Sequence, residues 1–151
     1  MSKIRITKQF TFEMAHVLRN YDGPCKNIHG HSYKLDVTVA GTPNDHENSP
    51  KYGMVMDYKD LKDIVKDNVL NNFDHALLIS EKYDMPTIQQ LQKDFEKTIT
   101  VPYQPTTENL LLEIAAKLKK LLPPGMQLFK LKLRETATAY AEWYAEDNPE
   151  Q

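Results

Sequence analysis

The sequence predicts an α+β fold in which an antiparallel four-stranded sheet carries two helices on one face. Two stretches that alternate between hydrophobic and polar residues come first, two stretches of helical period follow, and a last pair of alternating stretches ends the chain. Hairpins that are separated by helices favour an antiparallel sheet with its helices on one side. The chain has 151 residues and no internal repeat or linker-like stretch, so a single domain over 1–151 is expected.

The first two strands are expected over residues 4–16 and 29–39. In both segments the residues two apart are hydrophobic and those between them are mostly polar, which is the period of a half-buried strand. A loop over 19–28, rich in turn formers, lies between the two. A long antiparallel pair is therefore expected at the start of the chain.

Two amphipathic helices are expected next. Asp57 is suited to cap a helix that extends to Phe73, because a carboxylate at this position accepts a hydrogen bond from the first free amides. Thr106 or Thr107 caps the second helix, which is rich in leucine and ends at the Pro-Pro-Gly of 123–125.

The remaining segments are less regular. Residues 79–104 are expected to be irregular apart from a short helical piece around 89–97. From Gln127 onward the chain alternates again and then turns back as an edge hairpin strand.

Composition and charge exclude several classes of function. Lys and Arg number 19 and Asp and Glu number 21, so a net charge of −2 provides no basic field for a nucleic-acid backbone. No basic cluster adjoins an apolar stretch, no apolar run could span a membrane, and the first residues lack the hydrophobic centre of a secretory signal. The single cysteine, Cys25, cannot form a disulfide within the chain. We therefore expect a cytoplasmic protein that binds neither nucleic acid nor membrane.

Four ionisable side chains continue the hydrophobic faces of the expected strands, because residues two apart on a strand point to the same side. His16 follows the face of the first strand, and His29 and His31 precede that of the second. Glu135 continues the face that is formed by Phe129, Leu131 and Leu133. Three imidazoles from neighbouring strands form the nitrogen face of a catalytic zinc site with an open fourth position. The alternative is three core histidines with hydrogen-bonded partners.

Cys25 and the pair Asp74 and His75 are candidates for acid–base chemistry. Cys25 lies four residues before His29 and next to Lys26, and positive charges nearby would favour its thiolate, a base or nucleophile. It could instead complete a closed zinc site with the histidines, or be a small buried hydrophobic residue. Asp74 and His75 could relay a proton across a substrate, or could simply be a helix-terminal histidine and a surface aspartate.

Two further positions suit the binding of a polar heterocycle. Thr106 and Thr107 begin a helix, where free amides could anchor a ligand, although a plain helix start explains them and Glu108 as well. The carboxylate of Glu135 suits a planar edge with two N–H donors, as in an aminopyrimidinone, because it can accept both hydrogen bonds.

The chain resembles the 6-pyruvoyl-tetrahydropterin synthase family in six segments that occur in family order. They are FTFEMAH (10–16), CKNIHGHSY (25–33), GMVMDYKDLK (53–62), FDHALL (73–78), PTTENLL (105–111) and LRETATA (133–139). The spacing Cys-x-x-x-His-Gly-His, formed by Cys25, His29 and His31, looks like the 6-carboxy-5,6,7,8-tetrahydropterin synthase branch, because the pyruvoyl-forming branch typically has a longer gap.

The resemblance implies a reaction and a set of site residues. The reaction converts 7,8-dihydroneopterin triphosphate to 6-carboxy-5,6,7,8-tetrahydropterin with release of acetaldehyde and triphosphate, in 7-deazaguanine (queuosine) biosynthesis. The residues that the resemblance implies are His16, His29 and His31 for Zn2+, Cys25, Asp74, His75 and Glu135 for catalysis, and Thr106, Thr107 and Glu135 for substrate binding. Arg19, Lys26 and Lys34 are the candidates for the triphosphate.

The resemblance also implies the tunnelling fold, in which sheets from several subunits join into a barrel and active sites lie between subunits. A homohexamer or another homo-oligomer is therefore expected. The chain departs from the family pattern in the long segment 80–104 and in its C-terminal extension past 139. The alternatives are a 6-pyruvoyl-tetrahydropterin synthase or another pterin side-chain lyase, a noncatalytic zinc- or pterin-binding protein, and an interaction module with incidental histidines.

Overall fold

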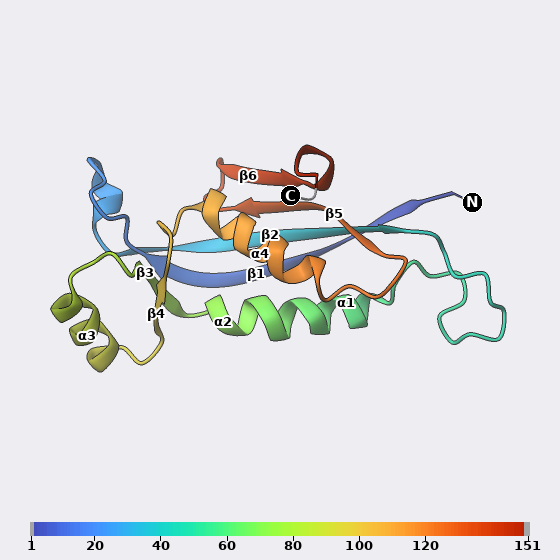
Figure 1. The fold of residues 1–151 in the computed structure, drawn as a ribbon, viewed down its shortest axis with the longest axis horizontal. Coiled ribbons are helices and arrows are strands. Elements are labelled where there is room, and N and C mark those ends of the chain that lie inside the picture. The colour runs from blue at the N-terminus through green and yellow to red at the C-terminus, as the bar shows by residue number, and fades with distance from the viewer. Residues whose placement is uncertain (1, 150–151) are drawn as a thin grey trace.

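Alternating side chains build a mixed six-stranded sheet with the strand order β4-β3-β1-β2-β5-β6 in the computed structural model, which describes residues 2–149 (Figure 1). The strands are β1 Ile4–His16, β2 His29–Gly41, β3 Ala76–Ser80, β4 Thr98–Val101, β5 Gln127–Arg134 and β6 Tyr140–Tyr144. The helices are α1 Tyr58–Val65, α2 Asn71–Phe73, α3 Met85–Asp94 and α4 Thr107–Lys119. A π-helical turn, Lys66–Leu70, connects α1 to α2, and short 3-10 turns occur at Pro24–Lys26 and Ala145–Asp147.

The expected long antiparallel pair at the start of the chain is confirmed. β1 and β2 pair over their whole lengths, from Ile4 opposite Gly41 to His16 opposite His29. β5 pairs antiparallel with β2, and β6 with β5. These four strands form the antiparallel part of the sheet, and they place the histidines at one end of it.

The prediction of a purely antiparallel, four-stranded sheet with two helices is wrong. β3 runs parallel to β1, and β4 runs parallel to β3, so the sheet is mixed and has six strands. The helix α3 connects these two strands and packs a second small cluster in which Ile88 contacts Val17 and Ile79. The segment 79–104 is thus a strand, a helix and a strand. β3 and β4 are only five and four residues long, and such short runs carry too little period to be read as strands.

The helix starts and the core follow the sequence pattern. The carboxylate of Asp57 accepts a hydrogen bond from the amide of Lys59 at 2.8 Å and caps α1. The core lies between one face of the sheet and the helices α1, α2 and α4, and its fully buried members include Leu35, Leu61, Ile114, Leu118, Leu131 and Leu133. Within residues 2–149, no helix is both long and apolar enough to cross a membrane.

One predicted core position is wrong. The register of β5 against β2 shifts by one residue between Thr38 and Val39, so Leu128 is buried in place of Phe129. Phe129 is half-buried, and its ring lies 3.7 Å below the guanidinium of Arg5. A β-bulge moves one side chain to the other face, and simple alternation does not anticipate it. The positions nearer the site, Leu131 and Leu133, keep the predicted face.

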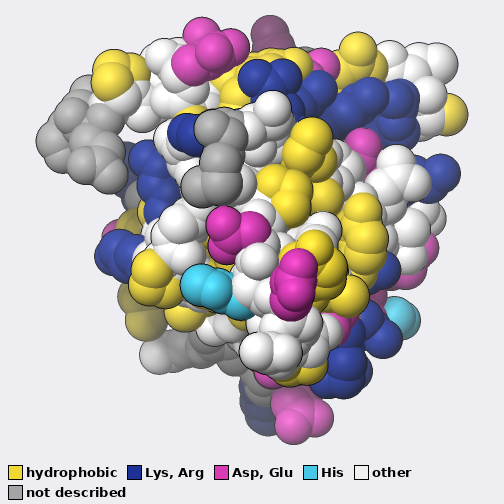
Figure 2. Space-filling model, turned by 90° about the vertical axis from the view of Figure 1, so that its right-hand side faces the viewer, with side chains coloured by type: hydrophobic (Ala, Val, Ile, Leu, Met, Phe, Trp, Pro, Cys, Tyr) yellow, Lys and Arg dark blue, Asp and Glu magenta, His cyan; other side chains and the backbone are white. Residues whose placement is uncertain are grey.

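The two ends of the sheet differ in character. The histidine end lies at the left of Figure 1, and the loop 42–57 and the turn 123–126 lie at the right. A cavity of about 470 Å³ at the right-hand end has Met54, Met56 and Met126 in its lining. Figure 2 shows that end, where hydrophobic side chains gather in the middle of the face and Lys and Arg side chains lie along its upper edge. The polar cluster that concerns function is at the opposite end.

Candidate active site

Three imidazoles meet where β1 ends and β2 begins. His16 and His29 are directly opposite each other in the antiparallel register, and His31 stands two residues further along β2 on the same face. The ring centroids are 4.6 Å apart for His16 and His29, 5.2 Å for His16 and His31, and 4.9 Å for His29 and His31. One nitrogen from each ring lies within 4.8 Å of the other two. The structure brings together the trio that strand parity predicts.

Hydrogen bonds to backbone carbonyls decide which nitrogen carries the proton in two of the rings. His16 Nδ1 is 2.7 Å from the carbonyl oxygen of Pro105, and His29 Nδ1 is 2.8 Å from that of Asn27. A carbonyl oxygen only accepts, so each Nδ1 donates and the Nε2 of each neutral ring keeps a lone pair. Those two Nε2 atoms are 3.0 Å apart. Lone pairs that face each other at this distance repel unless a proton or a cation lies between them.

His31 adds a third nitrogen to the same space. Its Nε2 is buried and has no hydrogen-bond partner. Burial is the largest cause that lowers the pKa of His16 and of His31, and the charge of His29 lowers both further, against the opposing effect of Glu135. The neutral imidazole is the form that binds metals, and the carbonyl bonds orient two of the rings. The donor set therefore fits a divalent cation such as zinc.

Glu135 reaches this cluster from just beyond the end of β5. Its Oε1 is 3.5 Å from Nε2 of His31 and 3.6 Å from Nε2 of His16. Its amide donates to the carbonyl of Ala139 at 3.1 Å, which ties the residue to the turn between β5 and β6. The side chain is 28% exposed, so the carboxylate lies at the boundary between the cluster and the solvent.

Tyr33 is a neighbour of the cluster that the sequence reasoning missed. It is fully buried, its ring stacks on Phe12 at 5.0 Å and stands edge-on to His31 at 5.6 Å, and its hydroxyl has no hydrogen-bond partner. Burial is the largest cause that raises the pKa of Tyr33, and the negative charges of Glu135 and Cys25 raise it further. The sequence could have predicted this position, because Tyr33 lies two residues after His31 on β2 and its side chain points to the same face.

Cys25 lies beside the cluster and is not part of it. It belongs to the 3-10 turn Pro24–Lys26 in the loop between β1 and β2, and its free thiol is half-buried. Its carbonyl accepts a hydrogen bond from the amide of Leu18 at 3.1 Å, which fixes the turn against the end of β1. Among residues 2–149, the group of potential ligand atoms within 4.8 Å of one another consists of the three histidines. Both the Cys25 thiol and Glu135 are outside it, but Glu135 Oε1 still lies within 3.6 Å of two of the imidazole nitrogens. This geometry does not favour Cys25 as a fourth metal ligand.

Asp74 and His75 connect α2 to β3, and Asp74 is the residue at which α2 ends. The amide of His75 donates to the carbonyl of Glu13 at 2.6 Å, and the amide of Glu13 donates to Asp74 Oδ1 at 2.9 Å. His75 lines a shallow cavity of about 340 Å³ together with outward-facing Glu13, Gly30 and Ser32 and with His31 of the imidazole cluster. In the described part of the chain no hydrogen bond or ion pair connects Asp74 or His75 to the histidine cluster. Within one chain, His75 therefore shares a cavity with His31 but is not bonded to the imidazoles.

The geometry of this pair nevertheless suits a proton relay. His75 Nδ1 is 3.1 Å from Asp74 Oδ2, and the imidazole is 77% exposed. The hydrogen bond from the Glu13 amide is the largest cause that lowers the pKa of Asp74, and the bond to His75 lowers it further. His75 has a φ of 60°, in the left-handed region that non-glycine residues rarely adopt. Such a conformation at an exposed histidine is typical of a functional position.

Thr106 and Thr107 adjoin the cluster through the residue before them. The carbonyl of Pro105 binds His16, and the hydroxyl of Thr106 accepts from the amide of Asn109 at 3.3 Å and caps α4. Thr107 is buried. The predicted N-cap is confirmed for Thr106, and the helix begins beside the three imidazoles.

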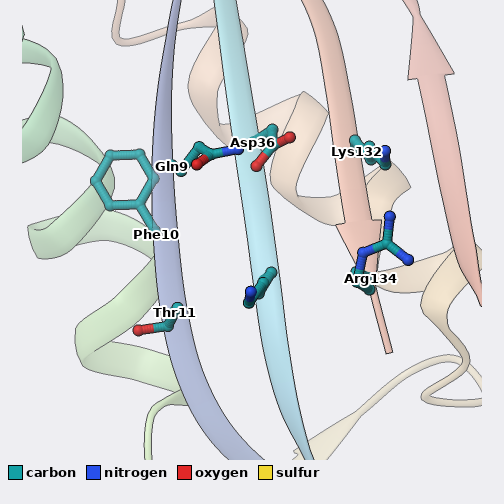
Figure 3. Close-up of a pocket in the computed structure, with 7 residues that line it drawn as sticks. Gln9, Phe10, Thr11, Asp36, Lys132 and Arg134 are labelled. Carbon is teal, nitrogen blue, oxygen red and sulfur yellow. The ribbon is translucent and has the colours of Figure 1, made fainter. Parts of the chain in front are cut away.

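A cluster of cations occupies the outer face of the sheet (Figure 3). Lys132 and Arg134 of β5 lie side by side across from Asp36 of β2, and with Lys34 they line a cavity of about 340 Å³. Of the three candidates for triphosphate binding, Lys34 is the one that lies in this cationic cavity. Strand parity places the cavity on the face opposite to the three imidazoles.

Comparison with known proteins gives consistent matches. The sequence profile of the 6-pyruvoyl tetrahydropterin synthase family matches residues 5–146. The chain is 36% identical over 141 residues to the 6-carboxy-5,6,7,8-tetrahydropterin synthase of Haemophilus influenzae, with 92% of this chain and 97% of that one covered. It is 30% identical to the enzyme of the same name from Rickettsia felis, with 92% and 99% covered. The structure of Caenorhabditis elegans 6-pyruvoyl tetrahydropterin synthase superposes with a TM-score of 0.68 at 27% identity, with 95% and 96% covered.

Proposed function

Because the chain belongs to the 6-pyruvoyl tetrahydropterin synthase family, we propose that it is a 6-carboxy-5,6,7,8-tetrahydropterin synthase. It would convert 7,8-dihydroneopterin triphosphate to 6-carboxy-5,6,7,8-tetrahydropterin with release of acetaldehyde and triphosphate, in 7-deazaguanine (queuosine) biosynthesis. The observation that carries the proposal is the face of three imidazole nitrogens, contributed by His16, His29 and His31, with the carboxylate of Glu135 at its rim. Two relatives named for this reaction match over more than nine tenths of both chains.

Each residue of the site has a role that follows from its chemistry. The three histidines would hold zinc, which supplies a Lewis acid for the oxygens of the substrate side chain. The Cys25 thiolate would take a proton from a carbon of that side chain. The carboxylate of Glu135 would accept hydrogen bonds from the N–H edge of the pterin ring. The start of α4 at Thr106 and Thr107 would contact the far side of the pterin ring.

We also propose that a second copy of the chain completes each site. The imidazoles and Glu135 continue the helix-covered face, whereas the cationic cavity lies on the other face of the sheet. His75 is exposed, shares a cavity with His31 and has no bond to it. A substrate bound to the imidazoles of one chain therefore meets the relay pair and the cations of a neighbouring chain. Such a shared site would form in a homo-oligomer with the tunnelling fold, in which the sheets of several subunits join into a barrel.

Mixing two inactive variants tests the shared site. Cys25→Ala and His75→Ala each lack one half of the proton-transfer machinery, so each alone should be inactive. If the halves come from different chains, random re-association of equal amounts restores about a quarter of the sites. Activity should therefore return after the two variants are dissociated and re-associated together. A mixture that stays inactive while its size distribution matches the wild type would show that each site is made within one chain.

Product analysis tests the reaction itself. The metal-loaded protein is incubated with 7,8-dihydroneopterin triphosphate, and acetaldehyde, triphosphate and the pterin product are identified. The expected result is 6-carboxy-5,6,7,8-tetrahydropterin with stoichiometric acetaldehyde. A 6-pyruvoyl product would assign the chain to the other reaction of the family. Tight binding of zinc and pterin without turnover would indicate a noncatalytic binding protein.

A further inference from the structure

Four potential metal-binding atoms lie close together at the histidine end of the sheet. The Nε2 atoms of His16 and His29 face each other because both Nδ1 atoms donate to carbonyls. The Nε2 of His31 is buried without a hydrogen-bond partner. The fourth atom is Oε1 of Glu135, which lies against the Nε2 atoms of His16 and His31. A carboxylate oxygen beside the lone pair of the His16 Nε2 is unfavourable unless a cation is shared between them.

The spacings of these atoms suit one coordination shell. Ligand atoms about 2.0–2.2 Å from a tetrahedral zinc ion lie about 3.3–3.6 Å from one another. The observed separations are 3.0 Å between His16 and His29, 3.5 Å between His31 and Glu135, and 3.6 Å between His16 and Glu135. The two separations that involve Glu135 lie at the upper end of that range, and the one between His16 and His29 is shorter. Glu135 is outside the group of atoms that are all within 4.8 Å of one another, so its carboxylate must move towards His29 to join the shell. The Glu135 side chain is 28% exposed, so it has room for the small rotation that would complete the shell.

We propose that Glu135 is the fourth ligand of the metal in the substrate-free protein. The carboxylate then has two alternative partners, the metal before the substrate binds and the pterin N–H edge afterwards. This second partner rests on the proposed function, whereas the metal–carboxylate contact does not. The site is closed to solvent and to small anions until a substrate that offers both side-chain oxygens and N–H donors displaces the carboxylate.

Cobalt(II) spectroscopy without substrate tests the fourth ligand. Cobalt(II) occupies zinc sites, and its visible bands report the number and type of ligands. The Glu135→Ala variant should have shifted bands and a zinc affinity at least tenfold weaker, because water replaces the carboxylate. Added acetate should move the bands of this variant back towards those of the wild type and leave the wild-type spectrum unchanged. Glu135→Gln, which keeps the size of the side chain, gives a second reading if the alanine variant does not fold.

Glu142→Ala is the matched control, since its carboxylate pairs with Lys130 and not with a histidine. Its cobalt spectrum and its zinc affinity should equal those of the wild type. Weaker affinity alone would not distinguish a ligand from a residue that merely orients one, because loss of such a partner also costs about 10- to 100-fold. Identical bands in Glu135→Ala and wild type, with no response to acetate, would overturn the proposal. That result would leave the reaction intact, which product analysis decides separately.

Discussion

The thiol of Cys25 is not among the side chains that would bind a metal at the histidine cluster. It lies on a turn beside the cluster, and its sulfur is outside the group of ligand atoms that approach one another within 4.8 Å. A metal that is held by His16, His29 and His31 needs no sulfur ligand. The nearby cation would instead stabilise the thiolate as a base.

Substitution of Cys25 by alanine should therefore separate binding from chemistry. Zinc content per chain should stay at the wild-type value, and turnover should fall by roughly 100- to 10,000-fold, the usual contribution of a positioned base. His31→Ala is the companion variant, and it should lose both zinc and turnover. Loss of zinc from Cys25→Ala would show that the thiol is a ligand and would contradict the catalytic assignment.

His75 has an unfavourable backbone conformation although its side chain makes few contacts. Its φ of 60° is unfavourable for a side chain with a Cβ atom, yet its imidazole is 77% exposed and pairs only with Asp74. The backbone is held there by the bond from its amide to the carbonyl of Glu13. The residue is therefore better suited to a reaction than to the stability of the fold.

A pair of substitutions at this position should expose that cost. Both His75→Gly and His75→Ala remove the imidazole and should be equally inactive. Relief of the left-handed conformation favours glycine by about 1–2 kcal/mol, and its greater freedom in the unfolded chain takes back about 0.5–1 kcal/mol. Denaturant unfolding should thus find the glycine variant more stable by roughly 0.5–1 kcal/mol. An alanine variant of equal or higher stability would show that the positive φ is not kept in solution.

Parity explains which single residues the sequence could predict. His16, His29 and His31 continue regular strands, so period two places them on one face without any knowledge of the fold. The same rule extends to Tyr33, whose hydrophobic ring conceals that its hydroxyl is unpaired. The rule fails at Phe129, because the register shift arises from the pairing of β5 with β2 and cannot be recognised in the sequence of β5 alone.

At the scale of elements, the start of α4 connects helix stability to the metal site. The Thr106 hydroxyl caps the helix, and the carbonyl of the residue before it holds the His16 ring. The residue that caps α4, Thr106, therefore directly follows Pro105, whose carbonyl accepts the hydrogen bond from the His16 ring. Any movement of the first turn of α4 would reorient a metal ligand.

Removal of this cap should therefore affect two measurements. Thr106→Ala should lower the free energy of unfolding by about 1 kcal/mol, as cap deletions do, and should also weaken zinc binding. Asp84→Ala is the matched control, because Asp84 caps α3 through the amide of Thr87 at 2.9 Å and has no contact with the histidines. It should lose similar stability and keep its zinc affinity. Equal zinc affinities in the two variants would show that the cap does not support His16.

The elements that could not be predicted are those whose pairing is remote in sequence. Both predicted N-caps, Asp57 and Thr106, are confirmed, because a cap is a local hydrogen bond. The parallel strand β3 pairs with β1, more than sixty residues earlier in the chain, and β4 in turn pairs with β3. These short segments become strands because they pair with a neighbouring strand, so the hydrophobic period of their own residues predicts an irregular segment.

At the scale of the whole molecule, the sheet divides the candidate machinery between its two faces. The face that packs on the helices ends in the three imidazoles, and the outer face carries the cationic cavity. The net charge of −2 thus coexists with a local concentration of Lys and Arg, at the place where a triphosphate would need them. Parity predicts the imidazole face from the sequence, whereas the cationic cavity depends on the pairing of β2 with β5.

The metal-free protein should lose stability in mild acid, and the direction follows from the buried histidines. Burial lowers the pKa of His16 and His31 below the ordinary value of about 6.5. As the pH falls through that value, the unfolded chain binds protons that the folded chain refuses, so the stability of the fold decreases. Thermal unfolding in excess chelator should therefore give a lower Tm at pH 5.5 than at pH 7.5. The carboxyls of Asp74 and Asp84, whose pKa values are lowered from 3.8, remain ionised throughout this window. His31→Gln should flatten the dependence, whereas substitution of the exposed His46 should not. An equal slope in His31→Gln and wild type would contradict the assignment of the effect to the histidine cluster.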